Sequence, residues 1–265
     1  MPSCNILIGC SGSVSVLKIP QLVSELIETN KYNVKIVLTK SALFFLEHAS
    51  TYNKVEWERF CRHDGESLIL IDEDEWEMWT EIGDPVLHIE ARKWADVLCI
   101  CPASADLMAK ISHGVSDNLL LCIARAWDHS KPAVLCPAMN TVMWNQKVTN
   151  RTIDRLTEDG WLIIHPVVKT LACREVGNGA LAAVGDIIQR LQDLTDTICV
   201  ETGRDDKEIV VPRNTRHESF PFANKYTSLT SRDRDFSLTS HSLLLFGGFA
   251  AVLAIGITIG RSSLH

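Results

Sequence analysis

Short apolar runs alternate with amphipathic stretches along the first 195 residues of the chain. The apolar runs are bounded by glycine and proline, and they predict strands at Asn5–Gly9, Asn33–Leu38, Asp96–Cys101, Pro132–Cys136 and Trp161–Ile164. Apolar positions at helical spacing predict helices at Val14–Thr29, Ala103–Ser112, Asn118–Trp127, Trp144–Glu158 and Val184–Thr195. Pro20 is expected to kink the first of these helices.

Continuously apolar strands separated by helices predict an α/β fold, with a parallel sheet that helices cover on both faces. Right-handed crossovers then give a three-layer, doubly wound parallel sheet of the Rossmann-like or flavodoxin-like kind. Ligands of such folds bind beyond the carboxyl ends of the strands. We therefore expect the functional residues in the loops that follow the strands.

One segment of this region departs from the alternation. Glu56–Glu77 is acidic and carries tryptophan, most densely in the DEDEWEMW run at Asp72–Trp79. We interpret it as a solvated loop that precedes a helix.

The composition changes after Thr195. Residues 202–240 are rich in Ser, Thr, Arg and Asp, which predicts a disordered linker. Residues 243–260 then run for 18 positions without a charge, and a helix of that length spans roughly 27 Å, close to the thickness of a bilayer core. We predict a folded domain at 1–195, a polar linker at 196–241 and a transmembrane tail anchor at 242–260. The anchor would hold a cytoplasmic domain on an intracellular membrane, and a buried core helix is the alternative.

Composition and charge narrow the classes of function. The chain is 46% hydrophobic and 22% charged, which suits a globular domain, and its net charge of −7 argues against binding to nucleic acid. Nine cysteines without a C-x-x-C pair form a poor disulfide framework and fit a reducing compartment. Several lie in apolar runs, where free cysteine behaves as a small hydrophobe, and we expect no metal site.

Two loops carry residues that suit a phosphate group. Gly9–Ser13 follows the first strand, where backbone N–H groups at the start of the next helix can bind an anion. The Ser11 and Ser13 hydroxyls can donate further hydrogen bonds to the same anion. Thr39-Lys40-Ser41 follows the second strand, and a doubly wound fold would bring both loops to one crevice. Together they suggest a mononucleotide phosphate, although a Gly/Ser turn can also be only a tight connection.

Three further segments carry a resemblance to a known family. They are Gly83–Glu90 (GDPVLHIE), Pro137–Trp144 (PAMNTVMW), and Leu171-Ala172-Cys173 followed by Gly177–Ala180. In this order they resemble the phosphopantothenoylcysteine decarboxylases, a branch of the homo-oligomeric flavin-containing cysteine decarboxylases. The resemblance covers about residues 4–195.

The resemblance implies an FMN cofactor and a substrate, 4′-phosphopantothenoylcysteine, that is converted to 4′-phosphopantetheine in coenzyme A biosynthesis. It also implies a homotrimer, or an assembly of trimers, with active sites between subunits. The positions that match the family's FMN site are Ser13, Val14, Ser15, Thr39, Lys40, Ser41, Ala105, Asp106, Leu107, Met108 and Met139.

The same resemblance assigns the chemistry to three residues. His88 would act as a base or electrostatic partner, Asn140 would bind the substrate carboxylate, and Cys173 would donate a proton to the ene-thiolate left after CO₂ departs. Ala172 and Leu181 match positions that contact the substrate. Without the resemblance, these residues would be interpreted as a structural histidine, a turn-forming or capping asparagine and a buried cysteine.

The chain departs from the family pattern in the substrate clamp and beside the flavin. Asp106 replaces an amide, and Thr170, Arg174, Glu175 and Ala183 replace the residues usual at those positions. Two alternatives therefore accompany the decarboxylase interpretation. One is a flavin-binding regulatory subunit that resembles protein phosphatase inhibitors, and the other is a flavin decarboxylase that acts on another cysteine-terminated substrate.

Overall fold

A computed structural model describes residues 4–170 and 176–201 of the chain. Six parallel strands form the main sheet in the order β3-β2-β1-β4-β5-β6. Their bounds are β1 Cys4–Cys10, β2 Tyr32–Leu38, β3 Ile69–Leu70, β4 Val97–Ala103, β5 Ala133–Pro137 and β6 Leu162–Ile163. This order confirms a doubly wound sheet and is the Rossmann order, so the flavodoxin-like alternative is wrong.

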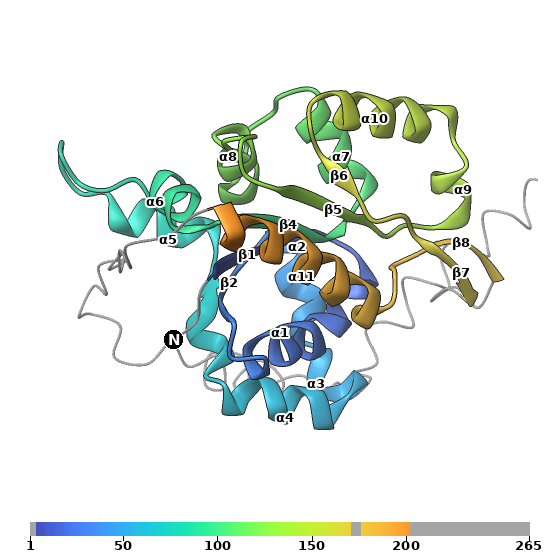
Figure 1. Cartoon of the computed structure of the whole chain (residues 1–265), viewed down its shortest axis with the longest axis horizontal. Coiled ribbons are helices and arrows are strands. Elements are labelled where there is room, and N and C mark those ends of the chain that lie inside the picture. Colours follow the sequence, from blue (N-terminus) through green and yellow to red (C-terminus); the bar gives the residue numbers. More distant parts are fainter. Residues whose placement is uncertain (1–3, 171–175, 202–265) are drawn as a thin grey trace, which may run out of the picture. The chain divides into compact units, whose positions relative to one another are not determined.

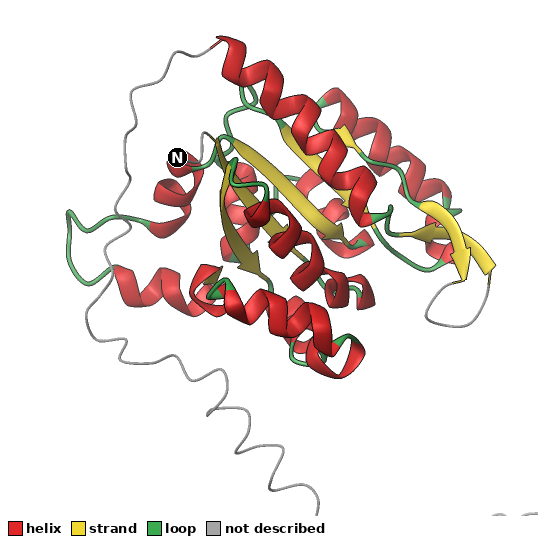
Figure 2. Cartoon of the chain, turned by 60° about the horizontal axis from the view of Figure 1, so that its bottom comes forward, coloured by secondary structure: helices red, strands yellow, loops and turns green. Residues whose placement is uncertain are grey.

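Two further strands, β7 (Val167–Thr170) and β8 (Val176–Ala180), pair antiparallel as a separate hairpin. Figure 2 shows this hairpin projecting beside the main sheet. The pattern of apolar positions in the sequence did not predict it.

Helices cover both faces of the sheet, as predicted (Figure 1). One face carries α6 (Leu87–Trp94), α7 (Ala105–Ser112), α8 (Leu119–Arg125) and α10 (Lys147–Glu158), and the other carries α1 (Ile19–Glu28), α4 (Lys54–Arg62) and α11 (Val184–Glu201). The shorter helices are η1 Val14–Lys18, α2 Lys40–Leu46, α3 Ala49–Tyr52, η2 Gly65–Leu68, α5 Asp72–Met78 and α9 Thr141–Trp144.

Strand alternation divides the buried side chains into two cores. Ile6 and Ile8 of β1 pack toward α1 and α11, whereas Leu7 between them packs toward α6 and α8. Both sets are fully buried, which explains why the strands are apolar without interruption. Cys99, Cys101 and Cys136 are free thiols inside the first core, as predicted for small hydrophobes.

Two predicted helices are each divided in the structure. Val14–Thr29 consists of η1 and α1, and Pro20 lies in the first turn of α1, where its missing N–H costs no hydrogen bond. The Trp144–Glu158 segment belongs to α9 and α10, which Asn145 and Gln146 separate. The kink that we expected from Pro20 is therefore a helix start.

The acidic segment is also structured, so our interpretation of Glu56–Glu77 as a solvated loop is wrong. It contains α4, η2, β3 and α5. Four of the five acidic residues of α5 lie in its first turn, where they interact favourably with the N–H groups at the start of the helix.

The region after the folded domain lies largely outside the described residues. The helix α11 continues beyond Thr195 to Glu201, and the predicted linker beyond that point and the predicted anchor at 242–260 are not described. Within residues 4–170 and 176–201, no helix is long and apolar enough to cross a membrane.

Candidate active site

The loops that follow β1 and β2 meet, as the sequence predicts for a common crevice. Gly12 lies so close to Ser41 that a Cβ atom on it would be 2.6 Å from Ser41 Oγ. Thr39 Oγ1 lies 3.2 Å from Ser41 Oγ, and it also accepts a hydrogen bond from Ala42 N at the start of α2. Glycine at position 12 therefore permits the close approach of the two hydroxyl-bearing loops.

Ser11 connects the loop after β1 to the loop after β4. Its hydroxyl donates to the Pro102 carbonyl oxygen at 2.9 Å and accepts from Ser104 N at 2.7 Å. Ser11 is 2% exposed, so its hydroxyl serves the fold and is not available to an anion. The expected role of Ser11 as a phosphate ligand is therefore wrong.

Other groups of the two loops fit a phosphate. Ser13 is half-buried at the start of η1, and its side chain accepts a long hydrogen bond of 3.3 Å from Ser15 N. Ser41 and Lys40 are exposed at the start of α2. Hydroxyl donors and an ammonium group on neighbouring turns are the chemistry that a phosphomonoester requires.

The turn between β4 and α7 presents both core and surface residues. Leu107 and Met108 are buried in the second core, so a ligand at this turn would meet Ala105 and the backbone. Asp106 is exposed, and its carboxylate lies 3.4 Å from Lys110 Nζ one helical turn away. Asp106 therefore shares the Lys110 ammonium group with Asp117, whose carboxylate lies closer to it at 3.0 Å.

The turn between β5 and α9 carries Asn140. Its Oδ1 accepts a hydrogen bond of 2.8 Å from Val142 N and so caps α9. The preceding residue, Met139, donates its N–H to the Gly179 carbonyl oxygen of β8 at 2.9 Å. The β7–β8 hairpin is thereby fixed beside the asparagine turn.

Gly179 is required at this contact. Its φ of +129° is unfavourable for other residues, and a Cβ atom would lie 2.5 Å from the Met139 carbonyl oxygen. Ala172 and Cys173 fall between β7 and β8, outside the described residues. Leu181 follows β8 and is 2% exposed within the first core.

His88 lies near the start of α6 and contacts a residue that sequence reasoning did not single out. Its Nδ1 lies 2.6 Å from Glu75 Oε1 of α5, and its backbone N–H donates to Glu75 Oε2 at 3.0 Å. The two side chains are 25% and 15% exposed. The signal for Glu75 was present in the DEDEWEMW run, but it could be identified only once that run was known to be a helix.

The structure does not bring all the predicted residues together. Figure 1 shows α5 and α6 at one side of the domain and α9 with the β7–β8 hairpin at the opposite side. His88 near the start of α6 and Asn140 at the start of α9 therefore belong to elements on opposite sides of the domain. The described residues also contain no cluster of His, Cys, Asp and Glu that could hold a metal ion.

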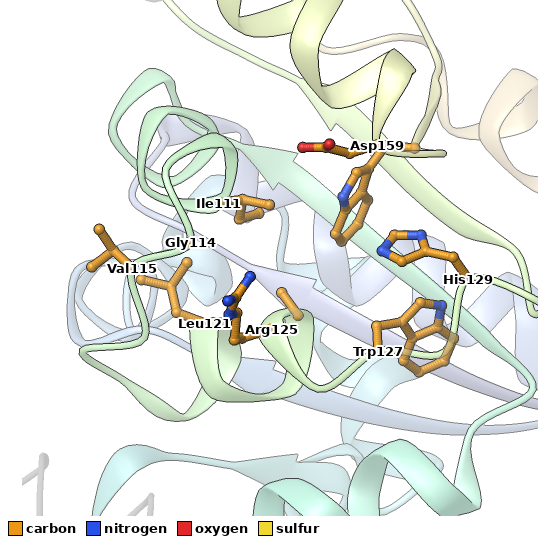
Figure 3. A pocket seen from close by; sticks show the side chains of 10 residues that line it. Ile111, Gly114, Val115, Leu121, Arg125, Trp127, His129 and Asp159 are labelled. Atoms are coloured by element: carbon orange, nitrogen blue, oxygen red, sulfur yellow. The ribbon is translucent and has the colours of Figure 1, made fainter.

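A cavity of about 270 Å³ lies elsewhere, where α7, α8 and α10 end. Arg125 and His129 line it with the indoles of Trp127 and Trp161 (Figure 3). No predicted site residue contributes to this cavity.

Comparisons with known proteins agree with the fold and the motifs. The model of the flavoprotein family matches residues 1–196. A phosphopantothenoylcysteine decarboxylase of Arabidopsis thaliana is 46% identical over 177 residues, which are 67% of this chain and 78% of the relative. The enzyme of the same name from Mus musculus is 39% identical over 187 residues, which are 71% and 85% of the two chains.

Two solved structures are similar over nearly their whole length. One is a PPC decarboxylase with a cysteine-to-serine mutation in complex with pantothenoylaminoethenethiol, with a TM-score of 0.64 and 41% identity over 73% of this chain and 99% of that one. The other is the FMN-binding protein AtHal3, with a TM-score of 0.63 and 42% identity over 74% and 98%. The chain therefore belongs to the flavoprotein family, in the group that contains the phosphopantothenoylcysteine decarboxylases.

Proposed function

We propose that the protein decarboxylates 4′-phosphopantothenoylcysteine to 4′-phosphopantetheine in coenzyme A biosynthesis, with FMN as its cofactor. The observation that carries this proposal is the similarity to a decarboxylase that was captured with pantothenoylaminoethenethiol. An ene-thiol of that kind is the product expected when CO₂ leaves a pantothenoylcysteine whose Cβ–S unit has been oxidised.

The residues present fit the cofactor. Ser13, Lys40 and Ser41 would hold the phosphate, and Ala105 and Met139 would lie against the ring system. When bound, FMN supplies a hydride acceptor and donor, which gives the reaction the electron sink that loss of CO₂ requires.

Each candidate residue has a chemical role in this proposal. The Asn140 amide would donate a hydrogen bond to the substrate carboxylate without the full charge that would stabilise the carboxylate to be lost. His88 would take a proton or face the reacting carbon as a cation. Cys173 would return a proton to the ene-thiolate, and a cysteine-to-serine mutant in complex with an ene-thiol is consistent with such a step.

The separation of His88 from Asn140 supports a site that two subunits form together. We propose a homotrimer in which His88 of one subunit faces Asn140 of the next. Identical chains that associate through two different surfaces form a ring when the rotation between neighbours closes, and each interface of the ring would then hold one site.

The membrane anchor at 242–260 stays a proposal from the sequence. A truncation that tests it should end after Glu201, because Thr195 Oγ1 lies 3.0 Å from the hydroxyl of Tyr32 and α11 continues beyond it. We expect the full chain in the membrane fraction and the truncated chain in the supernatant. A full-length chain found only in the supernatant would refute the anchor.

The test of the main proposal uses the purified full-length protein and synthetic 4′-phosphopantothenoylcysteine. We expect the absorption bands of oxidised flavin, release of CO₂ and formation of 4′-phosphopantetheine by mass spectrometry. Protein that binds FMN but forms no product from this substrate would overturn the assignment. Turnover of another cysteine-terminated substrate would then favour a related decarboxylase, and no turnover would favour a regulatory subunit.

A further inference from the structure

Glu75 makes two hydrogen bonds to a single residue, His88. One carboxylate oxygen accepts from the backbone N–H of His88 at 3.0 Å, and the other lies 2.6 Å from the Nδ1 atom of its imidazole. Both side chains are mostly buried, with 15% of Glu75 and 25% of His88 exposed. The geometry therefore fixes both the start of α6 and the orientation of the ring.

This arrangement determines which ring nitrogen carries the proton. A backbone N–H can only donate, so Glu75 Oε2 must accept. The ionised carboxylate has only acceptors, so Oε1 also requires a donor, and Nδ1 must carry a hydrogen. In the neutral imidazole the lone pair then lies on Nε2, on the far side of the ring from Glu75.

We propose that Glu75 is a positioning residue that holds His88 as the Nδ1–H tautomer, with Nε2 directed to the reacting groups. The proposal rests on the proposed function, because it assumes that His88 takes part in the reaction. Carboxylates that hold an imidazole in one tautomer have this effect in other enzymes, where loss of the correct tautomer slows turnover while the geometry is kept.

The position of Glu75 is itself well fixed. Asp72, at the start of α5, accepts a hydrogen bond of 2.8 Å from Leu119 N and so ties α5 to α8. Asp74 accepts from Ile71 N at 2.8 Å and closes the first turn of α5. Glu75 therefore projects from a helix that is held at its start.

Other charged groups surround this pair and must be considered. Burial raises the pKa of the Cys122 thiol, and the negative charges of Glu75, Asp72 and Asp117 raise it further. Arg92 lies one turn beyond His88 on α6 and pairs weakly with Asp128 at 3.8 Å. Replacing Glu75 would both remove a negative charge near His88 and change its hydrogen bond. The control variant must therefore remove a nearby charge and leave the hydrogen bond intact.

The decisive variant is Glu75→Gln, with Glu73→Gln as its matched control. A glutamine has one acceptor oxygen, which the His88 backbone N–H would occupy. Its NH₂ group would then face Nδ1, which must become an acceptor, so the proton is expected to move to Nε2. Glu73 is exposed on the same helix, and its replacement removes one charge without touching His88.

The readout is the ¹⁵N spectrum of histidine-labelled, full-length protein, with the His88 signal assigned from a His88→Asn sample. We expect Nδ1–H in the wild type and in Glu73→Gln, and Nε2–H in Glu75→Gln. With 4′-phosphopantothenoylcysteine, kcat of Glu75→Gln should fall by about 10²-fold with little change in KM. Glu75→Asp, which restores two acceptor oxygens, should recover the Nδ1–H signal.

A wild-type His88 with its proton on Nε2 overturns the inference, even if no variant folds. So does a Glu75→Gln protein that keeps the Nδ1–H signal and the wild-type kcat. A wild type without decarboxylase activity whose tautomer still depends on Glu75 refutes the proposed function and leaves the positioning role supported. The two ideas can therefore fail separately.

Discussion

At the scale of single residues, Asn140 combines a structural and a proposed chemical role that can be separated. Its Oδ1 caps α9 through Val142 N, and aspartate caps helices equally well. Asn140→Asp should therefore fold normally. The variant would place a negative charge against the substrate carboxylate and remove the amide donor. We therefore expect kcat/KM to fall by at least about tenfold, which is the effect of losing one hydrogen bond to a charged group.

The control for this prediction is Asn145→Asp. Asn145 ends α9 and is exposed, so the same change of charge is made five residues away along the chain. Steady-state kinetics of both variants, with flavin absorbance to confirm cofactor content, provide the measurement. Equal losses in the two variants would mean that charge near α9, and not the Asn140 amide, is responsible.

Gly179 supports Asn140 from the hairpin side. Gly179→Ala would force a Cβ atom to 2.5 Å from the Met139 carbonyl oxygen at a φ of +129°, so we expect a loss of about 1–3 kcal/mol in the free energy of unfolding. Gly185→Ala is the matched control, because it lies in α11 with open space around it. Urea denaturation should show that Gly185→Ala changes the free energy of unfolding little or raises it. Similar losses in both variants would contradict the steric argument.

At the scale of elements, α1 and α4 are joined by a charged cluster whose effect depends on pH. Hydrogen bonds from Arg59, and secondly from His63, lower the pKa of Glu28 from 4.5 to about 2. Because the folded pKa is depressed, the stabilisation is complete above the unfolded value and is lost as the pH falls toward 2. Glu25 and Glu56 also lie near Arg59 and compete for its charge.

We predict that Glu28→Gln unfolds more readily than the wild type near neutral pH and that the difference disappears as the pH falls toward about 2. Denaturant titrations at several pH values measure it. The control Glu58→Gln removes only an exposed pair with Lys54 at 3.7 Å, which should matter little at any pH. A Glu28→Gln deficit that persists unchanged at the lowest pH would contradict the assignment.

The elements also show what the sequence could and could not predict. The main strands are apolar throughout because both faces are buried, so their pattern predicts both the strands and the layers. The helix α5 was missed because its seven residues are mostly acidic and none is fully buried, which resembles a solvated loop. The β7–β8 hairpin was missed because Gly177 and Gly179 interrupt any alternation in β8.

Local sequence motifs also predicted some residues of the candidate site and missed others. Asn140 and the proposed FMN loops lie in the turns after strands, so local motifs were enough to propose them. Glu75 depends on a contact with His88 across 13 residues between two helices, and no local pattern encodes that pairing. The Ser11 hydroxyl was misassigned because its partners, Pro102 and Ser104, lie more than 90 positions away.

At the scale of the whole molecule, the separation of α6 from α9 predicts how much activity mixtures of variant subunits should retain. If each site takes His88 from one subunit and Asn140 from its neighbour, two variants of reduced activity should complement each other. His88→Asn keeps an N–H group for Glu75, and Asn140→Asp keeps the cap of α9, so both should fold. Equal co-expression should give about a quarter of the wild-type activity per site, because half of the subunits are intact at each position.

Co-expression of the wild type with the double variant His88→Asn/Asn140→Asp is the control for that experiment. Sites formed between subunits should again retain about a quarter of the activity, whereas sites formed within single chains should retain about half. In the latter case the two single variants, when co-expressed, would also show no more activity than the average of the two alone. The pair of mixtures thus separates an assembled site from a self-contained one by activity alone, whatever the number of subunits in the ring.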